Sequence, residues 1–168
     1  MWKKLCPHTS VTTLYELPPG FFLARGIRGL IIDLDNTLVA WGEDKISCRM
    51  REWVREVQAA GLKICILSNA LEHRVQAVGK SLGIPWVSRA TKPRKHPFRR
   101  AINILGTTPK ETAVIGDQIF TDIWGGNRMR LYTIWTTPLS TEEFISTKAV
   151  RKLERLMVSR FRKKGILT

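Results

Sequence analysis

The 168-residue sequence is poor in cysteine, in acidic side chains and in long apolar runs. Its three cysteines, Cys6, Cys48 and Cys65, have no metal-binding spacing and cannot all pair, which argues against a disulfide framework or a cysteine-ligated zinc site. No run approaches the roughly 20 apolar residues that cross a bilayer. The lysines near the start precede no apolar segment of the kind that marks a secretory signal. We therefore expect a cytoplasmic setting.

Basic residues dominate the charge and are concentrated in two segments. Lys and Arg number 28 against 14 acids, a formal charge of +14. Residues 89–100 carry six basic side chains and no acid, and residues 148–164 carry eight with only Glu154 opposing them, so these two segments account for +13. Such segments are either solvated surface or a contact for an anionic partner, namely a membrane, a nucleic acid or a phosphorylated substrate.

Strand-like and helix-like segments alternate along the chain after an irregular stretch over 1–26. The apolar patterns predict strands at 28–34, 63–67, 86–87, 112–116 and 131–136. Helices are predicted at 47–60, 70–82, near 95–105, at 119–128 and at 141–164, where the last is strongly basic. Ser47 and Gly61 are the expected N-cap and stop of the first helix. This order predicts an α/β fold, one domain over 1–168 with a doubly wound parallel sheet and a core over about 27–137.

Polar residues lie at the carboxyl ends of four predicted strands or shortly after them. They are Asp33 and Asp35, Ser68 and Asn69, Lys92, and Asp117. Because ligands of open α/β sheets bind beyond the carboxyl ends of the strands, these side chains are expected at one site.

The residue types at this site suit the cleavage of a phosphate ester. One carboxylate, Asp33, can attack phosphorus, and Asp35 can act as acid and then base. Asp117 would complete a Mg²⁺ site, with Asp122 as a further carboxylate that either binds the ion or supports its ligands. The donors expected to hold the phosphate oxygens are Ser68, Asn69 and Lys92.

The same residues carry a family resemblance. The segments DLDNT at 33–37, LSN at 67–69, Lys92-Pro93 and GDQIFTD at 116–122 resemble the four motifs of the haloacid dehalogenase (HAD) superfamily, which has a Rossmann-like core. This resemblance implies that Asp33 is the nucleophile and Asp35 the acid/base. It also implies Mg²⁺ bound by Asp33, the backbone carbonyl of Asp35 and Asp117. We place Thr37 of the first motif with the substrate-binding residues. Lys95 is a rival to Lys92 for the third motif.

The spacing of the motifs also bears on the substrate. Only 32 residues separate Asp35 from Ser68 and 23 separate Ser68 from Lys92, which leaves no room for the cap domains of HAD enzymes. A capless site is open and favours a large substrate. The DLDNTLVAW and GDQIFTDIWGGNR segments and the basic tail resemble the YqeG-type, subclass IIIA branch, which implies hydrolysis of phosphatidylglycerophosphate to phosphatidylglycerol at the inner face of the membrane.

Two other functions are compatible with the same residues. A phosphatase for nucleic acid ends or phosphoproteins would use the basic segments equally well, and a nucleic-acid-binding or ribosome-associated module would use them without catalysis. For the membrane hypothesis, we expect the basic segments to meet anionic lipid, with shallow insertion by Trp2 and by Phe21 and Phe22. Trp41, just beyond the site, is either a flap residue beside the substrate or a packing residue.

Overall fold

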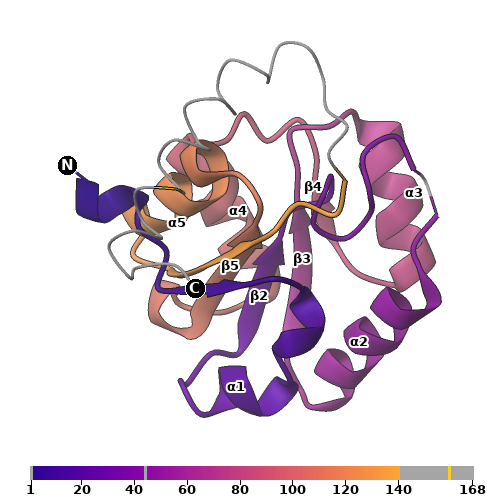
Figure 1. The fold of residues 1–168 in the computed structure, drawn as a ribbon, viewed down its shortest axis with the longest axis horizontal. Helices are drawn as coiled ribbons and strands as arrows, with labels where there is room; N and C mark the ends of the chain where they lie inside the picture. Colours follow the sequence, from indigo (N-terminus) through magenta and orange to yellow (C-terminus); the bar gives the residue numbers. More distant parts are fainter. Residues whose placement is uncertain (1, 44, 141–158, 160–168) are drawn as a thin grey trace.

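The computed structural model describes residues 2–43, 45–140 and 159 of the chain (Figure 1). Within these ranges six parallel strands form one sheet in the order β1-β6-β5-β2-β3-β4. The strands are β1 (Thr9–Val11), β2 (Gly29–Ile32), β3 (Lys63–Leu67), β4 (Trp86–Val87), β5 (Thr112–Gly116) and β6 (Tyr132–Thr136). The α-helices are α1 (Pro19–Leu23), α2 (Cys48–Ala59), α3 (Glu72–Leu82), α4 (Lys95–Leu105) and α5 (Trp124–Arg128). This is the α/β, Rossmann-like arrangement that the element order predicts.

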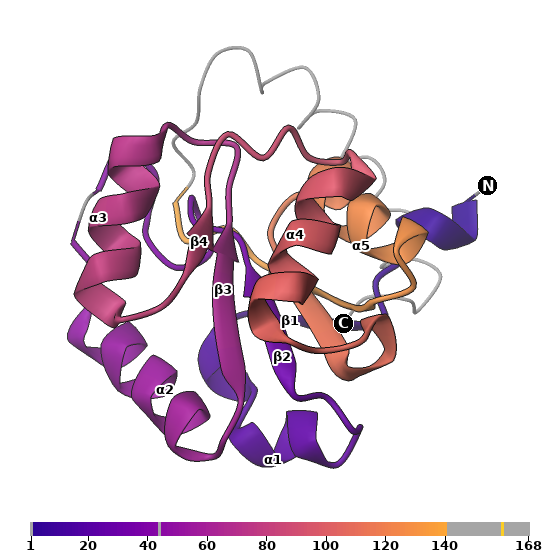
Figure 2. The same cartoon turned by 180° about the vertical axis from the view of Figure 1, so that it is seen from behind.

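The sheet is covered by helices on both faces, as Figures 1 and 2 show. Successive residues of β2 point to opposite sides, so Leu30 and Ile32 pack with the buried side chains of α1, α2 and α3, whereas Ile31 packs with those of α4. All three are fully buried. The apolar run at the centre of the sequence is therefore a central strand that contributes to two cores.

Local signals specify the helix boundaries well. In α2 the Ser47 hydroxyl accepts a hydrogen bond from the backbone N–H of Met50 at 3.1 Å, which caps the helix as expected. Gly61 follows the helix with φ of +85°, a conformation that favours glycine. Met50 and Trp53 face the core on the same side of the helix. The prediction for 47–60 is thus confirmed to within a residue at each end.

The prediction that residues 1–26 are irregular is wrong. Thr9–Val11 form an edge strand, β1, which pairs with β6 in the register Thr9 to Ile134. His8 adds a hydrogen bond from its backbone N–H to the carbonyl of Thr133 at 2.9 Å. Short 3₁₀ turns occupy Trp2–Leu5 and Leu14–Glu16. This strand forms because it pairs with a segment more than 120 residues away. A run of only three residues is too short for its apolar pattern to predict such a strand.

Shallow insertion by Phe22 is excluded by the fold, whereas insertion by the half-buried Phe21 stays a prediction. Phe22 is completely buried in the core, and Phe21 packs against it while Arg25 lies over its ring at 3.8 Å. The expected terminal helix over 141–164 lies outside the described residues except for Ser159. Among the helices that the structure describes, none is long and apolar enough to cross a bilayer.

The strand order creates a crevice at the centre of the sheet. From β2 the chain adds β3 and β4 on one side, and then β5 and β6 on the other. The segments that leave β2 and β5 at their carboxyl ends, here called the carboxyl edge of the sheet, therefore diverge. Asp33 and Asp117 are the first residues after these two strands. A ligand site is expected at such a divergence.

Candidate active site

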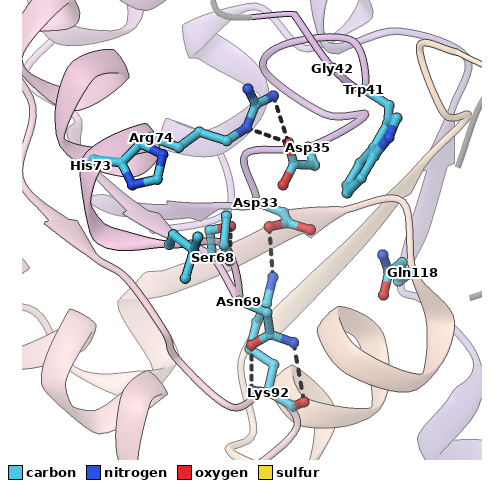
Figure 3. Close-up of a pocket in the computed structure, with 12 residues that line it drawn as sticks. Asp33, Asp35, Trp41, Gly42, Ser68, Asn69, His73, Arg74, Lys92 and Gln118 are labelled. Atoms are coloured by element: carbon cyan, nitrogen blue, oxygen red, sulfur yellow. Dashed lines mark hydrogen bonds and ion pairs between the residues drawn. The ribbon is translucent and has the colours of Figure 1, made fainter. Parts of the chain in front are cut away.

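Residues from four segments converge on one pocket at the carboxyl edge (Figure 3). The cavity has a volume of about 630 Å³. Of the residues predicted from the sequence, it is lined by Asp33, Asp35, Ser68, Asn69 and Lys92. The structure thus brings together side chains that are up to 59 positions apart in the sequence. Lys95, the rival to Lys92, is exposed on the surface and is not among the lining residues.

Three carboxylates form a buried cluster beneath the pocket. Asp33, Asp117 and Asp122 each offer an oxygen within 4.8 Å of the others, and all three side chains are buried. Such close like charges are unfavourable unless a cation lies between them. Carboxylate oxygens are among the ligands that hard divalent cations such as Mg²⁺ prefer. These three residues could therefore hold a metal ion.

Lys92 supplies one positive charge to this cluster. Its Nζ lies 2.8 Å from Oδ1 of Asp33 and donates a hydrogen bond to Oδ1 of Asp122 at 2.6 Å. Burial acts to lower the pKa of Lys92, but the two carboxylates outweigh it and raise that pKa, so the ammonium stays charged. One ammonium against three carboxylates leaves an excess of negative charge, which a divalent cation would offset.

The loop after β5 turns Asp122 toward the cluster. Residues Ile119–Ile123 form a π-helical turn in which the carbonyl of Gln118 accepts hydrogen bonds from the backbone N–H groups of Asp122 and Ile123. A side chain at position 116 would collide with the Asp122 carboxylate, so Gly116 is required there. Burial raises the pKa of Asp122 to about 7, although Lys92 opposes this shift. The predicted continuous helix over 119–128 is therefore replaced by this turn and the short α5.

Asp35 has different surroundings from Asp33, although only Leu34 separates them. Its Oδ1 accepts hydrogen bonds from Arg74 on α3 (Figure 3), and Asp35 is not a member of the carboxylate cluster. Burial raises the pKa of the Asp35 carboxyl, and the Arg74 guanidinium partly counteracts this shift. A raised pKa favours the protonated form of this carboxyl group, which is the form that a general acid needs. Two carboxylates with distinct environments are the arrangement that separates a nucleophile from an acid.

Asn69 holds the backbone of the loop that carries Lys92. Its Oδ1 accepts from the Lys92 N–H at 2.8 Å, and its Nδ2 donates to the Lys92 carbonyl at 3.5 Å. Ser68 is buried, and its hydroxyl accepts from the N–H of Ala70 at 3.1 Å. The Thr37 hydroxyl donates to Oδ1 of Asp117 at 3.5 Å, and Thr37 is not among the residues lining the pocket. Contact of these side chains with a phosphate stays a prediction.

Several lining residues were not predicted from the sequence. They are Leu71, His73, Arg74 and Gln118. Arg74 lies five positions after the LSN motif. This spacing could have predicted a side chain at the pocket only if the start of α3 had been known. Trp41 also lines the pocket. Its backbone N–H and that of Ser140 both donate to Oδ1 of Asn36 at 3.2 Å, which joins two segments beside the opening.

Comparison with known proteins places this geometry in context. Residues 39–130 match the family described as haloacid dehalogenase-like hydrolase. The chain is 36% identical to probable phosphatase YqeG of Bacillus subtilis, with 97% of the chain and 95% of that protein covered. It is 29% identical to phosphatidylglycerophosphate phosphatase 1 of Arabidopsis thaliana, over 95% of the chain and 49% of that longer protein. A mitochondrial phosphatidylglycerophosphatase of Saccharomyces cerevisiae is 30% identical, over 78% of the chain and 77% of its own length.

A solved structure supports the fold independently. An uncharacterized protein from Listeria monocytogenes superposes with a TM-score of 0.57 at 22% identity, covering 70% of this chain and 85% of that one. At this identity the likeness concerns the fold alone.

Proposed function

Because the chain belongs to the haloacid dehalogenase-like hydrolases, in the family of YqeG and the phosphatidylglycerophosphate phosphatases, and is a phosphatase of the HAD type, we propose that it hydrolyses phosphatidylglycerophosphate to phosphatidylglycerol. The observation that carries the proposed chemistry is the contrast between Asp33, held by Lys92 in the carboxylate cluster, and Asp35, held by Arg74. The lipid substrate is supported by the named activities of the plant and yeast relatives.

In the proposed first step, Asp33 is the nucleophile. A carboxylate oxygen of Asp33 forms a bond to phosphorus while the bond from phosphorus to the ester oxygen breaks. Asp35, in its acid form, donates its proton to the departing alkoxide, which leaves as an alcohol. Lys92 orients the Asp33 carboxylate through the contact at 2.8 Å. Asp33, the Asp35 carbonyl and Asp117 would hold Mg²⁺, which would reduce the repulsion between the attacking carboxylate and the phosphate. Asp122 would support this site through its hydrogen bond with Lys92.

The second step returns the enzyme to its starting state. Asp35, now a carboxylate, accepts a proton from water as the water oxygen attacks phosphorus. The bond between phosphorus and the Asp33 oxygen breaks, inorganic phosphate leaves, and Asp35 is again protonated. Ser68 and Asn69, at the pocket wall, and Thr37, beside Asp117, are proposed to hold the phosphate oxygens.

An open site in a single domain fits a substrate that remains in its bilayer. Among the described residues, those between Asp35 and Ser68 form α2 and β3, and those between Asn69 and Lys92 form α3 and β4. We propose that no cap covers the pocket, so that the headgroup of a membrane lipid can enter from outside. A phosphorylated nucleic acid end or phosphoprotein would meet the same steric requirement and is the second candidate substrate class.

The test compares phosphate release from three substrates in the presence of Mg²⁺. These are phosphatidylglycerophosphate in vesicles, a phosphorylated oligonucleotide and a small sugar phosphate. We expect release from the lipid, and loss of release from every substrate in Asp33→Asn with an unchanged circular dichroism spectrum. Hydrolysis of the oligonucleotide with the lipid untouched would refute the proposed substrate, and full activity of Asp33→Asn would refute the mechanism.

A further inference from the structure

Large apolar side chains are exposed at four places in the described part of the chain, two at each edge of the sheet. Leu23 and Ile104 are 46% and 42% exposed, and both precede segments that lead into the amino ends of strands. Leu71 and Leu139 are 54% and 42% exposed, and they follow β3 and β6 at the carboxyl edge. Figure 2 shows α1, which ends at Leu23, at the opposite edge from the loops of the active site.

The leucines of the carboxyl edge flank the pocket. Leu71 lines it together with Trp41. The backbone N–H of Leu139 donates to the carbonyl of Asn36 at 3.0 Å, and the Asn36 side chain accepts from the N–H of Trp41 at 3.2 Å. Leu139 is therefore joined through Asn36 to Trp41 at the pocket wall, and Leu71 belongs to the same wall. The side chains of Leu71, Trp41 and Leu139 make up what we call the apolar mouth.

Basic side chains share the carboxyl edge with the apolar mouth. The backbone N–H of Arg89 donates to the carbonyl of Ala70 at 3.0 Å, which places Arg89 next to Leu71. Arg94 and Lys95 are the last loop residue and the first residue of α4 on the same edge, and all three basic side chains are exposed. The neighbouring acid, Glu72, is engaged by Ser88 and Trp86. The edge thus combines exposed leucines with an excess of positive charge.

We propose that this carboxyl edge, with the apolar mouth and Arg89, Arg94 and Lys95, is the surface that contacts an anionic phospholipid bilayer, an inference that rests on the proposed function. Exposed leucines can enter the acyl boundary, and adjacent cations are attracted to anionic headgroups. Asp33 is only 6% exposed at the base of the pocket. A lipid phosphate can reach it without its acyl chains leaving the membrane only if the mouth faces the bilayer.

The test uses the full chain and pairs each change at the mouth with one at the opposite edge. Leu139→Ser is matched by Ile104→Ser, since both side chains are 42% exposed. Leu71→Ser is matched by Leu23→Ser. This pair is compared in the vesicle-binding assay and not in the turnover assay, because Leu71 lines the pocket. A triple Gln variant of Arg89, Arg94 and Lys95 is matched by a triple Gln variant of Arg28, Lys63 and Lys110, which are exposed at the amino edge.

Vesicle co-sedimentation and turnover provide separate readouts. We expect binding to vesicles of phosphatidylcholine and phosphatidylglycerol to weaken roughly fivefold for each basic residue removed at the mouth. Leu139→Ser should weaken it several-fold, since about half of a leucine side chain loses its apolar contact. Leu139→Ser and the mouth charge variant should hydrolyse a soluble phosphomonoester at the wild-type rate but vesicle-borne phosphatidylglycerophosphate more slowly. The matched variants should behave as wild type in all assays.

Other outcomes separate the surface from the substrate. If the lipid is hydrolysed but both sets of variants bind vesicles alike, the surface is wrong and the proposed function stands. If the protein binds vesicles only through the mouth yet hydrolyses no phosphatidylglycerophosphate, the substrate is wrong and the surface stands. If wild-type protein does not bind vesicles, or the mouth charge variant loses only its affinity for an oligonucleotide, the membrane surface is refuted.

Discussion

Arg74 donates to a single oxygen of Asp35, Oδ1, through both Nε at 3.0 Å and Nη2 at 2.9 Å. The same Nη2 also donates to the backbone carbonyl of Glu43 at 2.8 Å. One side chain of α3 thereby positions the proposed acid/base and the segment that follows Trp41. Because only the side chain of Arg has this rigid set of donors, Lys cannot reproduce both contacts.

Replacement of Arg74 by Gln is expected to lower kcat on the order of 10- to 100-fold, because the Asp35 carboxyl loses its fixed orientation. KM should change less, since Arg74 acts through Asp35 in this prediction. The kcat of Arg74→Lys should lie between those of Arg74→Gln and wild type. Steady-state kinetics on a soluble phosphomonoester measures this. Arg51→Gln, which removes a contact to the Ser81 carbonyl on a different part of the molecule, is the control. Wild-type kcat in Arg74→Gln would contradict the positioning role.

Replacement of Lys92 by Met should destabilise the fold by about 3–5 kcal/mol, because the buried carboxylates of Asp33 and Asp122 lose their ammonium partner. Adding Asp122→Asn should recover part of this loss, so the two changes should be non-additive by roughly 1–3 kcal/mol. Urea unfolding in EDTA measures the free energies. Lys95→Met, an exposed neighbour, should change stability by no more than about 0.5 kcal/mol. Additive effects of the Lys92 and Asp122 changes would show that the pair is not coupled.

Removal of the Asp117 carboxylate separates metal binding from folding. Wild-type protein should be stabilised by Mg²⁺, by about 2.7 kcal/mol at a concentration 100 times the dissociation constant. Asp117→Asn should lose this stabilisation and its activity. In EDTA, however, it should be at least as stable as wild type, since one buried negative charge is gone. Thermal denaturation with and without Mg²⁺ tests this, with Glu52→Gln as an exposed control. Equal stabilisation of Asp117→Asn by Mg²⁺ would argue that Asp117 is not a ligand.

His8 should make the stability depend on pH in mildly acidic solution. Its Nδ1 accepts from the backbone N–H of Thr133 at 3.1 Å, and partial burial of the ring lowers its pKa below the ordinary 6.5. Because the unfolded chain takes up the proton at a higher pH than the folded one, stability should fall as the pH drops below about 6.5. Urea midpoints at several pH values should show a smaller decline in His8→Gln. Parallel declines in the two proteins would exclude His8 as the cause.

The sequence predicted those parts of the fold that local signals determine. Apolar runs and helix caps were sufficient for β3, α2 and α4, and Asp33 and Asp117 were located because buried strands end directly before them. Partnerships between distant segments were not predictable in this way. Strand β1 has three residues and exists because β6 is beside it.

The role of Arg74 was missed for a related reason. Glu72, His73 and Arg74 are successive charged or polar residues at the start of α3, and which of them faces Asp35 depends on the exact rotation of the helix. The sequence does not reveal that rotation until Leu71 is identified as the N-cap. Similarly, the inward direction of Asp122 depends on a π-helical turn, which apolar periodicity does not distinguish from an ordinary helix.

Asn36 connects the Trp41 segment and the Leu139 segment beside the pocket by hydrogen bonds. Its φ of 60° lies in the left-handed region, where Asn is better tolerated than most side chains, and its carbonyl and side chain bind Leu139, Ser140 and Trp41. A displacement of the Trp41 segment is therefore transmitted to Leu139 through a single residue. If ligand entry shifts Trp41 and surface contact shifts Leu139, linkage requires that each event change the free energy of the other by the same amount.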